Sequence, residues 1–416
     1  MNSSFIERLN NKLNMIELTS KPIIENDIAW QQHGTPDKVI DMMLDMYYEN
    51  GEFNNNEKIL ILFNVEFIKQ IYFKYKDELI FGNLYFIADT KEKFDIVRKL
   101  YPNVHCLFCN EHIIEKLIEK IGEFNVKKFD IVFSNPPYNN GLDIVILNYI
   151  CKFSKNIIFL HPISWLLSND ITATKFNQYK KQKDNHFLKK LFIFKGNSIL
   201  NIKLFGGLGI SFFNTTQKFD NVEVIDRYYT NSIYKTDIYN ISIHGTNIDM
   251  VKEFQNKLNF YIKNHGNLLT NNIKNYEDLT DFSVRFAGIR GNIKNDTLSD
   301  DFYSMICKNY NDNKCDKNYR NSVEKYNLTL WSFKSENERM NFINYCKSKF
   351  ARFCLTFTKF NANLNHGQPT KQVPWLDFTQ EWNDAKLCKE FEISDKLWNY
   401  INNFIPDYYD DYKSGF

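Results

Sequence analysis

Four consecutive residues, Asn-Pro-Pro-Tyr at 135–138, combine reactive groups with a stiff backbone. They directly follow the apolar run 129–134, which is typical of a buried strand. Neither proline carries an N–H, so strand pairing must stop there, and the residue before each proline is held in an extended conformation. The turn therefore presents the carboxamide of Asn135, the carbonyl of Pro136 and the ring of Tyr138. In open parallel sheets, ligands bind at this carboxyl end of the strands.

The chemistry that this turn predicts is the binding of an exocyclic amino group on a planar base. The Asn135 carboxamide oxygen and the Pro136 carbonyl are two acceptors at fixed spacing, which suit an –NH2 group with two hydrogens to donate. Tyr138 offers a flat face on which a heterocycle can stack. An ordinary proline turn after a strand is the alternative. We interpret Asn135, Pro136, Pro137 and Tyr138 as the catalytic residues.

The stretch Asp-Ile-Val-Phe-Ser-Asn-Pro-Pro-Tyr at 130–138 resembles the catalytic motif of S-adenosylmethionine-dependent amino-methyltransferases. More narrowly, the chain resembles the adenine-N6 DNA methyltransferases of bacterial and phage restriction-modification systems. The resemblance is strong at 129–138, moderate at 30–46 and 373–382, and weak between them. It implies that S-adenosylmethionine is the methyl donor and that the acceptor is an adenine flipped out of double-stranded DNA.

Composition bounds the class of protein. The chain has 416 residues, of which 43% are hydrophobic and 25% charged, as in a folded protein with a full core and one large domain or two. The formal net charge is only +2, so a nucleic-acid enzyme of this composition must concentrate its basic residues locally. The 8 cysteines are scattered, and we find neither a signal segment nor an apolar run long enough to cross a membrane. We therefore expect a cytoplasmic protein with no membrane partner.

Alternating strand-like and helical segments predict the fold class. Four apolar runs are each followed by a helical or turn segment, which favours a doubly wound, Rossmann-like α/β methyltransferase sheet. Two further runs, 188–194 and 209–213, are typical of a terminal hairpin pair. We expect a second, mixed α+β target-recognition domain after this sheet. The expected divisions are a helical arm at 1–29, the catalytic domain at 30–215 and the DNA-binding domain at 216–416.

Polar residues at the ends of the expected strands predict a cofactor site. Asp89 ends the second strand, where an acidic residue usually accepts the ribose hydroxyls of a nucleoside. Asn64 and Glu66 follow the first strand, and Asn110 follows the third. The resemblance implies that Asn110 lies beside the cofactor's adenine. It also implies that Thr35, in the Thr-Pro turn that we expect to cap a helix, lines the methionine end.

The first turn of the expected sheet, 63–69, contains no glycine, although relatives commonly have a glycine-rich loop there. Two interpretations remain open. Either a differently shaped turn holds the cofactor, with Asn64 and Glu66 facing its methionine amino group, or cofactor binding has been lost. The second interpretation describes a catalytically degenerate, methyltransferase-fold subunit that binds DNA.

Basic residues suggest where nucleic acid binds. The run 175–190 is the densest in lysine, and it is either a solvated helix face or a phosphate-contacting surface that includes Lys180, Lys181 and Lys183. In the second domain, Arg285 and Arg290 are candidates for reading base edges. A restriction endonuclease or a second methyltransferase subunit are further expected partners.

Other chemistries are less well supported by the sequence. His105, Cys106, Cys109 and His112 lie in or beside an expected buried strand and lack a second cysteine pair at zinc spacing, so we expect no metal site. Methylation of a protein glutamine uses the same turn, but a small peptide target needs no long reading region after 215. Cytosine-N4 transfer is chemically close, and Tyr138 favours adenine over it.

Overall fold

A computed structural model describes residues 35–48, 56–75, 81–111, 114–138, 141–167, 176–196, 207–266, 268–269, 284–286, 307–309, 330–357, 373–405 and 407. The chain divides into two compact units, Met1–Gly245 and Thr246–Phe416. The helical arm expected at 1–29 lies outside the described residues. None of the helices in the described ranges is both long and apolar enough to cross a membrane.

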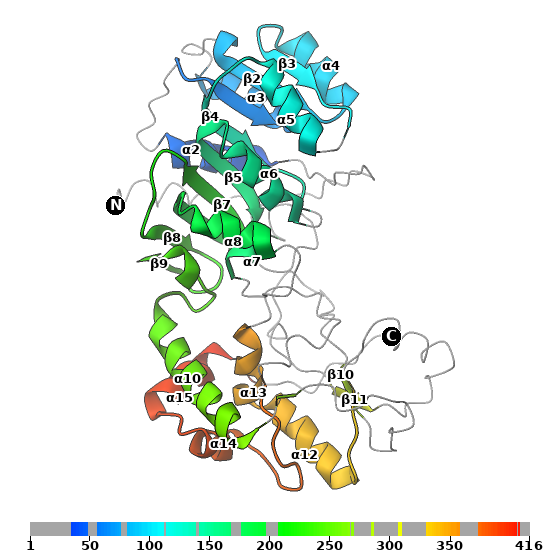
Figure 1. The fold of residues 1–416 in the computed structure, drawn as a ribbon, viewed down its shortest axis with the longest axis vertical. Helices are drawn as coiled ribbons and strands as arrows, with labels where there is room; N and C mark the ends of the chain where they lie inside the picture. Colours follow the sequence, from blue (N-terminus) through cyan, green and yellow to red (C-terminus); the bar gives the residue numbers. More distant parts are fainter. Residues whose placement is uncertain are drawn as a thin grey trace, which may run out of the picture. The chain divides into compact units, whose positions relative to one another are not determined.

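The first unit is built on a nine-stranded sheet in the order β3-β2-β1-β4-β5-β7-β6-β8-β9 (Figure 1). The five strands from β3 to β5 run parallel, β7 is antiparallel to both of its neighbours, and β9 is antiparallel to β8. This arrangement confirms the predicted doubly wound α/β sheet. The strands are β1 (Ile59–Leu62), β2 (Leu84–Ala88), β3 (His105–Phe108), β4 (Phe129–Ser134), β5 (Ser154–Pro162), β6 (Leu188–Lys195), β7 (Gly207–Asn214), β8 (Val222–Asp226) and β9 (Ser232–Thr236).

The sheet continues past the boundary that we expected at 215. Strands β6 and β7 pair as predicted, but they are not terminal, because β8 pairs with β6 and β9 pairs with β8. The division between the units falls after Gly245 instead. Four of the five residues in Val222–Asp226 are buried, as expected for a strand with neighbours on both sides.

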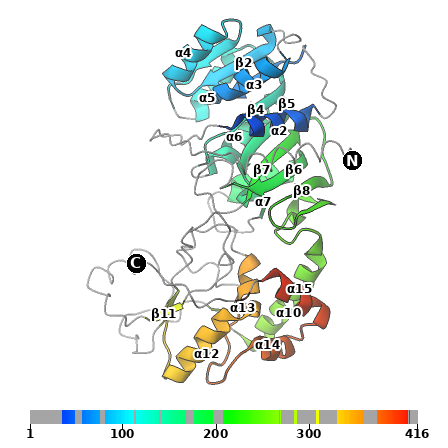
Figure 2. The ribbon, with the colours of Figure 1, turned by 180° about the vertical axis from the view of Figure 1, so that it is seen from behind.

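Helices cover both faces of this sheet (Figures 1 and 2). One face packs against α2, α3 and α4, whose apolar residues share one core cluster with those of β1, β2, β4 and β5. Helices α5, α6 and α8 lie on the other face. The helices of this unit are α2 (Asp37–Tyr47), α3 (Val65–Tyr75), α4 (Lys91–Leu100), α5 (Ile114–Glu123), α6 (Leu142–Ile150), α7 (Ser164–Leu167) and α8 (Phe176–Asp184).

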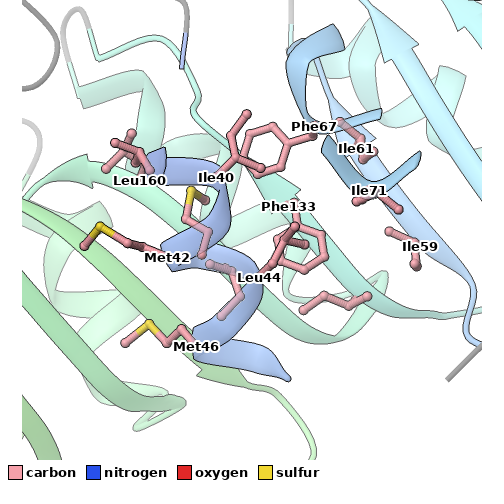
Figure 3. Packing of buried hydrophobic residues seen from close by; sticks show 14 of the residues in the cluster. Ile40, Met42, Leu44, Met46, Ile59, Ile61, Phe67, Ile71, Phe133 and Leu160 are labelled. Atoms are coloured by element: carbon pink, nitrogen blue, oxygen red, sulfur yellow. The ribbon is translucent and has the colours of Figure 1, made fainter. Parts of the chain in front are cut away.

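Helix α2 is packed directly onto the strands that carry the candidate site. The predicted apolar stripe of Val39, Ile40, Met43 and Leu44 is completely buried. Figure 3 shows side chains of α2 beside Phe133 of β4, whose ring stacks on that of Phe67 in α3 at 5.9 Å between centroids. Burying a side chain of this size stabilises the fold by roughly 1.5–3 kcal/mol. The stripe thus fixes where the segment before α2 approaches the sheet.

The second unit is the mixed α+β body that the sequence predicts. Its strands form a three-stranded antiparallel sheet in the order β11-β10-β12. Its helices surround a core rich in aromatic rings, including Phe254, Phe350 and Phe353. The elements are α10 (Ile248–His265), β10 (Val284–Phe286), β11 (Cys307–Asn309), β12 (Leu330–Trp331), α12 (Glu336–Lys347), α13 (Lys349–Cys354), α14 (Asp384–Glu390) and α15 (Asp395–Phe404).

Candidate functional site

The candidate site lies at the point where the strand order of the sheet reverses. From the neighbouring strands β1 and β4, the chain moves outward in opposite directions, through β2 and β3 on one side and β5 on the other. Leu62 at the end of β1 pairs in register with Ser134 at the end of β4. The two turns that follow therefore leave the same edge side by side. In doubly wound sheets, this crevice is the place where ligands bind.

Asn135 is held by residues from two distant segments and by Tyr138 of its own turn. Its backbone N–H donates to the side-chain oxygen of Asn64 at 3.3 Å, which joins the turn after β4 to the turn after β1. Its side-chain nitrogen donates to the hydroxyl oxygen of Thr35 at 3.0 Å. Its side-chain oxygen accepts a hydrogen bond from the Tyr138 hydroxyl. Asn135, Thr35 and Asn64 are each no more than 2% exposed, so these contacts are shielded from water and correspondingly strong.

The role of Thr35 differs in part from the prediction. Helix α2 begins at Asp37 with Pro36 as its N-cap residue, and no side chain caps it. The Thr35 hydroxyl instead accepts the hydrogen bond from Asn135. The sequence predicts Thr35 to be a helix cap, and the family resemblance implies a cofactor contact. The structure places it against the amide that we interpret as catalytic.

The glycine-free turn after β1 has an unusual backbone. Phe63 adopts a left-handed conformation with φ of 72°. The N–H of Asn64 donates to the carbonyl of Leu62 at 3.0 Å, which closes a three-residue turn with Phe63 at its centre. The Phe63 N–H donates to Ile87 of β2 at 2.8 Å, and the Phe63 side chain is fully buried. A left-handed conformation costs a residue with a Cβ about 1–2 kcal/mol, which packing must offset. Phe63 thus adopts a positive φ that usually requires glycine.

The other predicted cofactor residues follow neighbouring strands along the same edge. Asp89 comes directly after β2 and is 4% exposed, and its carboxylate lies 3.1 Å from the Lys93 ammonium in the first turn of α4. Glu66 lies in the first turn of α3 and is partly buried. Asn110 comes after β3 and is exposed. Because the strands are parallel, their carboxyl ends form one continuous edge with the turns at Asn64 and Asn135.

The three lysines predicted to contact nucleic acid differ in their exposure to solvent. Lys180 and Lys181 are exposed on α8, and Lys180 forms an ion pair with Asp184 at 2.7 Å. Lys183 is only 4% exposed, and its ammonium donates to the Leu166 carbonyl at 2.7 Å. Burial lowers the pKa of Lys183 to about 8. Lys183 therefore cannot reach a phosphate from this position. The Arg285 side chain and Arg290 lie outside the described parts of the chain.

A buried group of polar residues that the sequence did not reveal lies near the turn. The Asp143 carboxylate, in the first turn of α6, lies 3.4 Å from Nδ1 of His161, near the end of β5. The other ring nitrogen of His161 lies 2.8 Å from the Ser211 hydroxyl in β7. Burial and then the Asp143 charge raise the pKa of Tyr138 well above its ordinary value. The signal that could have indicated this group is a histidine that ends an apolar strand, immediately before a proline.

His105 and Cys106 make contacts within the sheet that involve no metal. A ring nitrogen of His105 lies 3.0 Å from the carbonyl of Gly82, and its ring stacks on Tyr85. Burial raises the pKa of the Cys106 thiol to about 12. His112 lies outside the described residues. Within the described ranges, no three histidine, cysteine or acidic side chains form a group that could hold a metal ion.

No model of a protein family matches this chain, and no curated protein does. Among solved structures, it is similar to the type I restriction-modification system methyltransferase subunit from Streptococcus thermophilus, with 12% identity over 51% of this chain and 52% of that chain, and a TM-score of 0.37. It is also similar to the type IIG restriction endonuclease BpuSI, with 10% identity over 74% and 40% of the two chains and a TM-score of 0.35. An O-methyltransferase from Bacillus cereus, solved in complex with SAH, has 11% identity over 50% and 91% and a TM-score of 0.32. Similarity at this level assigns neither a substrate nor a cofactor.

Proposed function

We propose that this protein is an S-adenosylmethionine-dependent DNA methyltransferase that acts on the N6 amino group of adenine. The observation that carries this proposal is the position of Asn135 at the switch point of the sheet, buried and held by Thr35, Asn64 and Tyr138. An amide held this firmly at a ligand-binding edge, followed by the Pro136 carbonyl, suits an amino group that must be oriented precisely.

The chemical problem is that the lone pair of an adenine amino group is delocalised into the ring, which makes the group a poor nucleophile. Hydrogen bonds from the amino group to the Asn135 side-chain oxygen and the Pro136 carbonyl favour a tetrahedral nitrogen whose lone pair is available. Positioning and oriented dipoles then supply the catalysis. The base must leave the duplex at a cost of a few kcal/mol, and stacking on Tyr138 returns roughly 1–3 kcal/mol of it.

The residues along the sheet edge suit S-adenosylmethionine. This cofactor supplies a methyl group activated by a sulfonium centre. We propose that the buried Asp89 carboxylate accepts ribose hydroxyls and that the exposed Asn110 contacts the adenine edge. Glu66 and Asn64, which flank the amino end of α3, are suited to the methionine amino group. Lys93 must release or share Asp89 when the ribose binds, because its ammonium already contacts that carboxylate.

We also propose double-stranded DNA as the partner and the second unit as the target-recognition domain. Lys180 and Lys181 are available for phosphate contacts, and Arg285 and Arg290 are proposed to read bases. A restriction endonuclease or a second methyltransferase subunit remains a proposed assembly partner. Methylation-sensitive sequencing of DNA from cells that express this chain tests the proposal, because it identifies the modified base and its sequence context together. Genomic DNA without N6-methyladenine above the level of a vector control would refute it.

One observation favours a second candidate, a non-catalytic DNA-binding subunit. The turn after β1 lacks glycine and is tightly closed around Phe63. Titration calorimetry with S-adenosylmethionine separates the candidates, since the enzyme must bind the cofactor and the non-catalytic subunit need not. Clear heat of binding that is lost in the Asp89→Asn protein favours the enzyme.

A further inference from the structure

The Asn135 amide already has partners within the chain at each of its polar groups. Asn64 accepts from its backbone N–H, Thr35 accepts from its side-chain nitrogen, and the Tyr138 hydroxyl donates to its side-chain oxygen. That oxygen is the acceptor which the proposed mechanism assigns to the substrate's amino group. The Tyr138 hydroxyl therefore donates to the oxygen that the substrate's amino group is proposed to use. The ring of the same residue is the proposed stacking surface for the base.

The Tyr138 hydroxyl is suited to remain a donor. Its pKa is raised well above the ordinary value by burial and by the nearby Asp143 carboxylate, so the phenol stays protonated at neutral pH. The Asp143 carboxylate in turn lies 3.4 Å from Nδ1 of His161, whose other nitrogen contacts Ser211, and these three residues are almost completely buried. The Tyr138 carbonyl accepts from the N–H of Gly141 at 3.2 Å, which fixes the turn on its far side.

We infer that the Tyr138 hydroxyl is a placeholder for the substrate's amino group and thereby selects bases that carry a hydrogen-bond donor at that position. The inference rests on the proposed function, whose substrate class it sharpens. An entering amino group replaces the Tyr138 hydroxyl as the donor, so the Asn135 oxygen keeps a hydrogen bond while the hydroxyl gives one up. A base with a carbonyl at this position also displaces the hydroxyl, but it has no hydrogen to donate. The Asn135 oxygen then loses its hydrogen bond and faces the oxygen of the base. Sites that lose a polar partner in this way reject the analogue strongly.

The matched ligands for testing this inference are deoxyadenosine and deoxyinosine, which differ by an amino group or a carbonyl at the same ring position. Their binding to the full chain is measured by ligand-observed NMR. We expect the wild-type protein to bind deoxyadenosine at least about 10-fold more tightly. Equal binding of the two nucleosides overturns the inference without any substitution being made.

The Tyr138→Phe protein gives the sharper test because it keeps the ring and removes only the competing donor. We expect it to bind deoxyadenosine about 2- to 10-fold more tightly than the wild type, because one net hydrogen bond no longer has to be displaced. A hydroxyl that contacts the substrate directly, or that merely supports the turn, predicts weaker or unchanged binding. Either of those results overturns the inference.

Tyr179→Phe is the matched control. Tyr179 lies on α8, and burial and the Asp143 charge raise its pKa as they do that of Tyr138. It forms no hydrogen bond with Asn135 in the described part of the chain, so removing its hydroxyl should leave both affinities unchanged. Thermal unfolding confirms that each variant is folded. Failure of the inference alone leaves the wild-type protein able to methylate DNA. If the proposed function is wrong, the folded wild-type protein binds neither nucleoside and methylates no DNA. That result overturns the proposed function and the inference together.

Discussion

Replacing Thr35 by valine tests whether the segment before α2 positions the Asn135 amide, which we propose to be catalytic. Valine keeps the shape of threonine but removes the hydroxyl that accepts from the Asn135 side-chain nitrogen at 3.0 Å. Both residues are at most 2% exposed, so the loss costs about 1–3 kcal/mol of stability. The amide also loses a constraint on its orientation. If about 1.4 kcal/mol of that loss is felt in the transition state, kcat falls about 10-fold.

The assay compares Thr35→Val with Thr215→Val. The Thr215 hydroxyl donates to the carbonyl of Ser154 at 2.5 Å, where β5 begins. This hydrogen bond therefore lies at the amino end of β5, away from the candidate site at the carboxyl ends of the parallel strands. Both variants should unfold at lower urea concentration than the wild type. Only Thr35→Val should lose kcat for methyl transfer to DNA, with little change in KM. Thr35→Val that retains the kcat of Thr215→Val would refute the positioning role.

Three other results are expected. Asn64→Ala removes the acceptor for the Asn135 N–H and should lower the free energy of unfolding by about 1–3 kcal/mol in urea titrations; an unchanged midpoint would contradict the contact. Asp89→Asn should weaken S-adenosylmethionine binding about 10-fold or more in calorimetry, whereas an unchanged Kd would exclude Asp89 from the ribose site. Burial lowers the pKa of His244 to about 3, so the unfolded chain binds more protons than the folded one between that value and 6.5. Stability should therefore fall as pH falls, by about 2 kcal/mol between pH 7 and pH 5, and His244→Gln should flatten this dependence; an identical slope in both proteins would contradict it.

The sequence was sufficient to predict the parallel sheet and the point where β4 ends. Proline chemistry specifies where β4 must end, and apolar runs at regular spacing specify the strands before it. The buried stripe on α2 follows equally from helical periodicity. These features depend on neighbours in the sequence, which is why residue patterns indicate them correctly.

The features that the sequence did not reveal depend on contacts between distant segments. Thr35 has the local preferences of a helix cap, but its partner Asn135 lies 100 residues away. Lys183 belongs to a basic run, and only the packing of α8 against α7 shows that it is buried. The left-handed Phe63 is unexpected because propensity assigns such turns to glycine. The division after Gly245 is likewise set by strand pairing beyond 215.

The most direct test of the central claim is methyl transfer by the purified protein. Double-stranded DNA is incubated with S-adenosylmethionine carrying a labelled methyl group, and its nucleosides are then analysed by mass spectrometry. We predict labelled N6-methyldeoxyadenosine with the wild-type protein, and a loss of at least about 100-fold with Asn135→Ala, which removes a preorganised acceptor. Labelled product formed at equal rates by the two proteins, or label on a base other than adenine, would contradict the proposed chemistry.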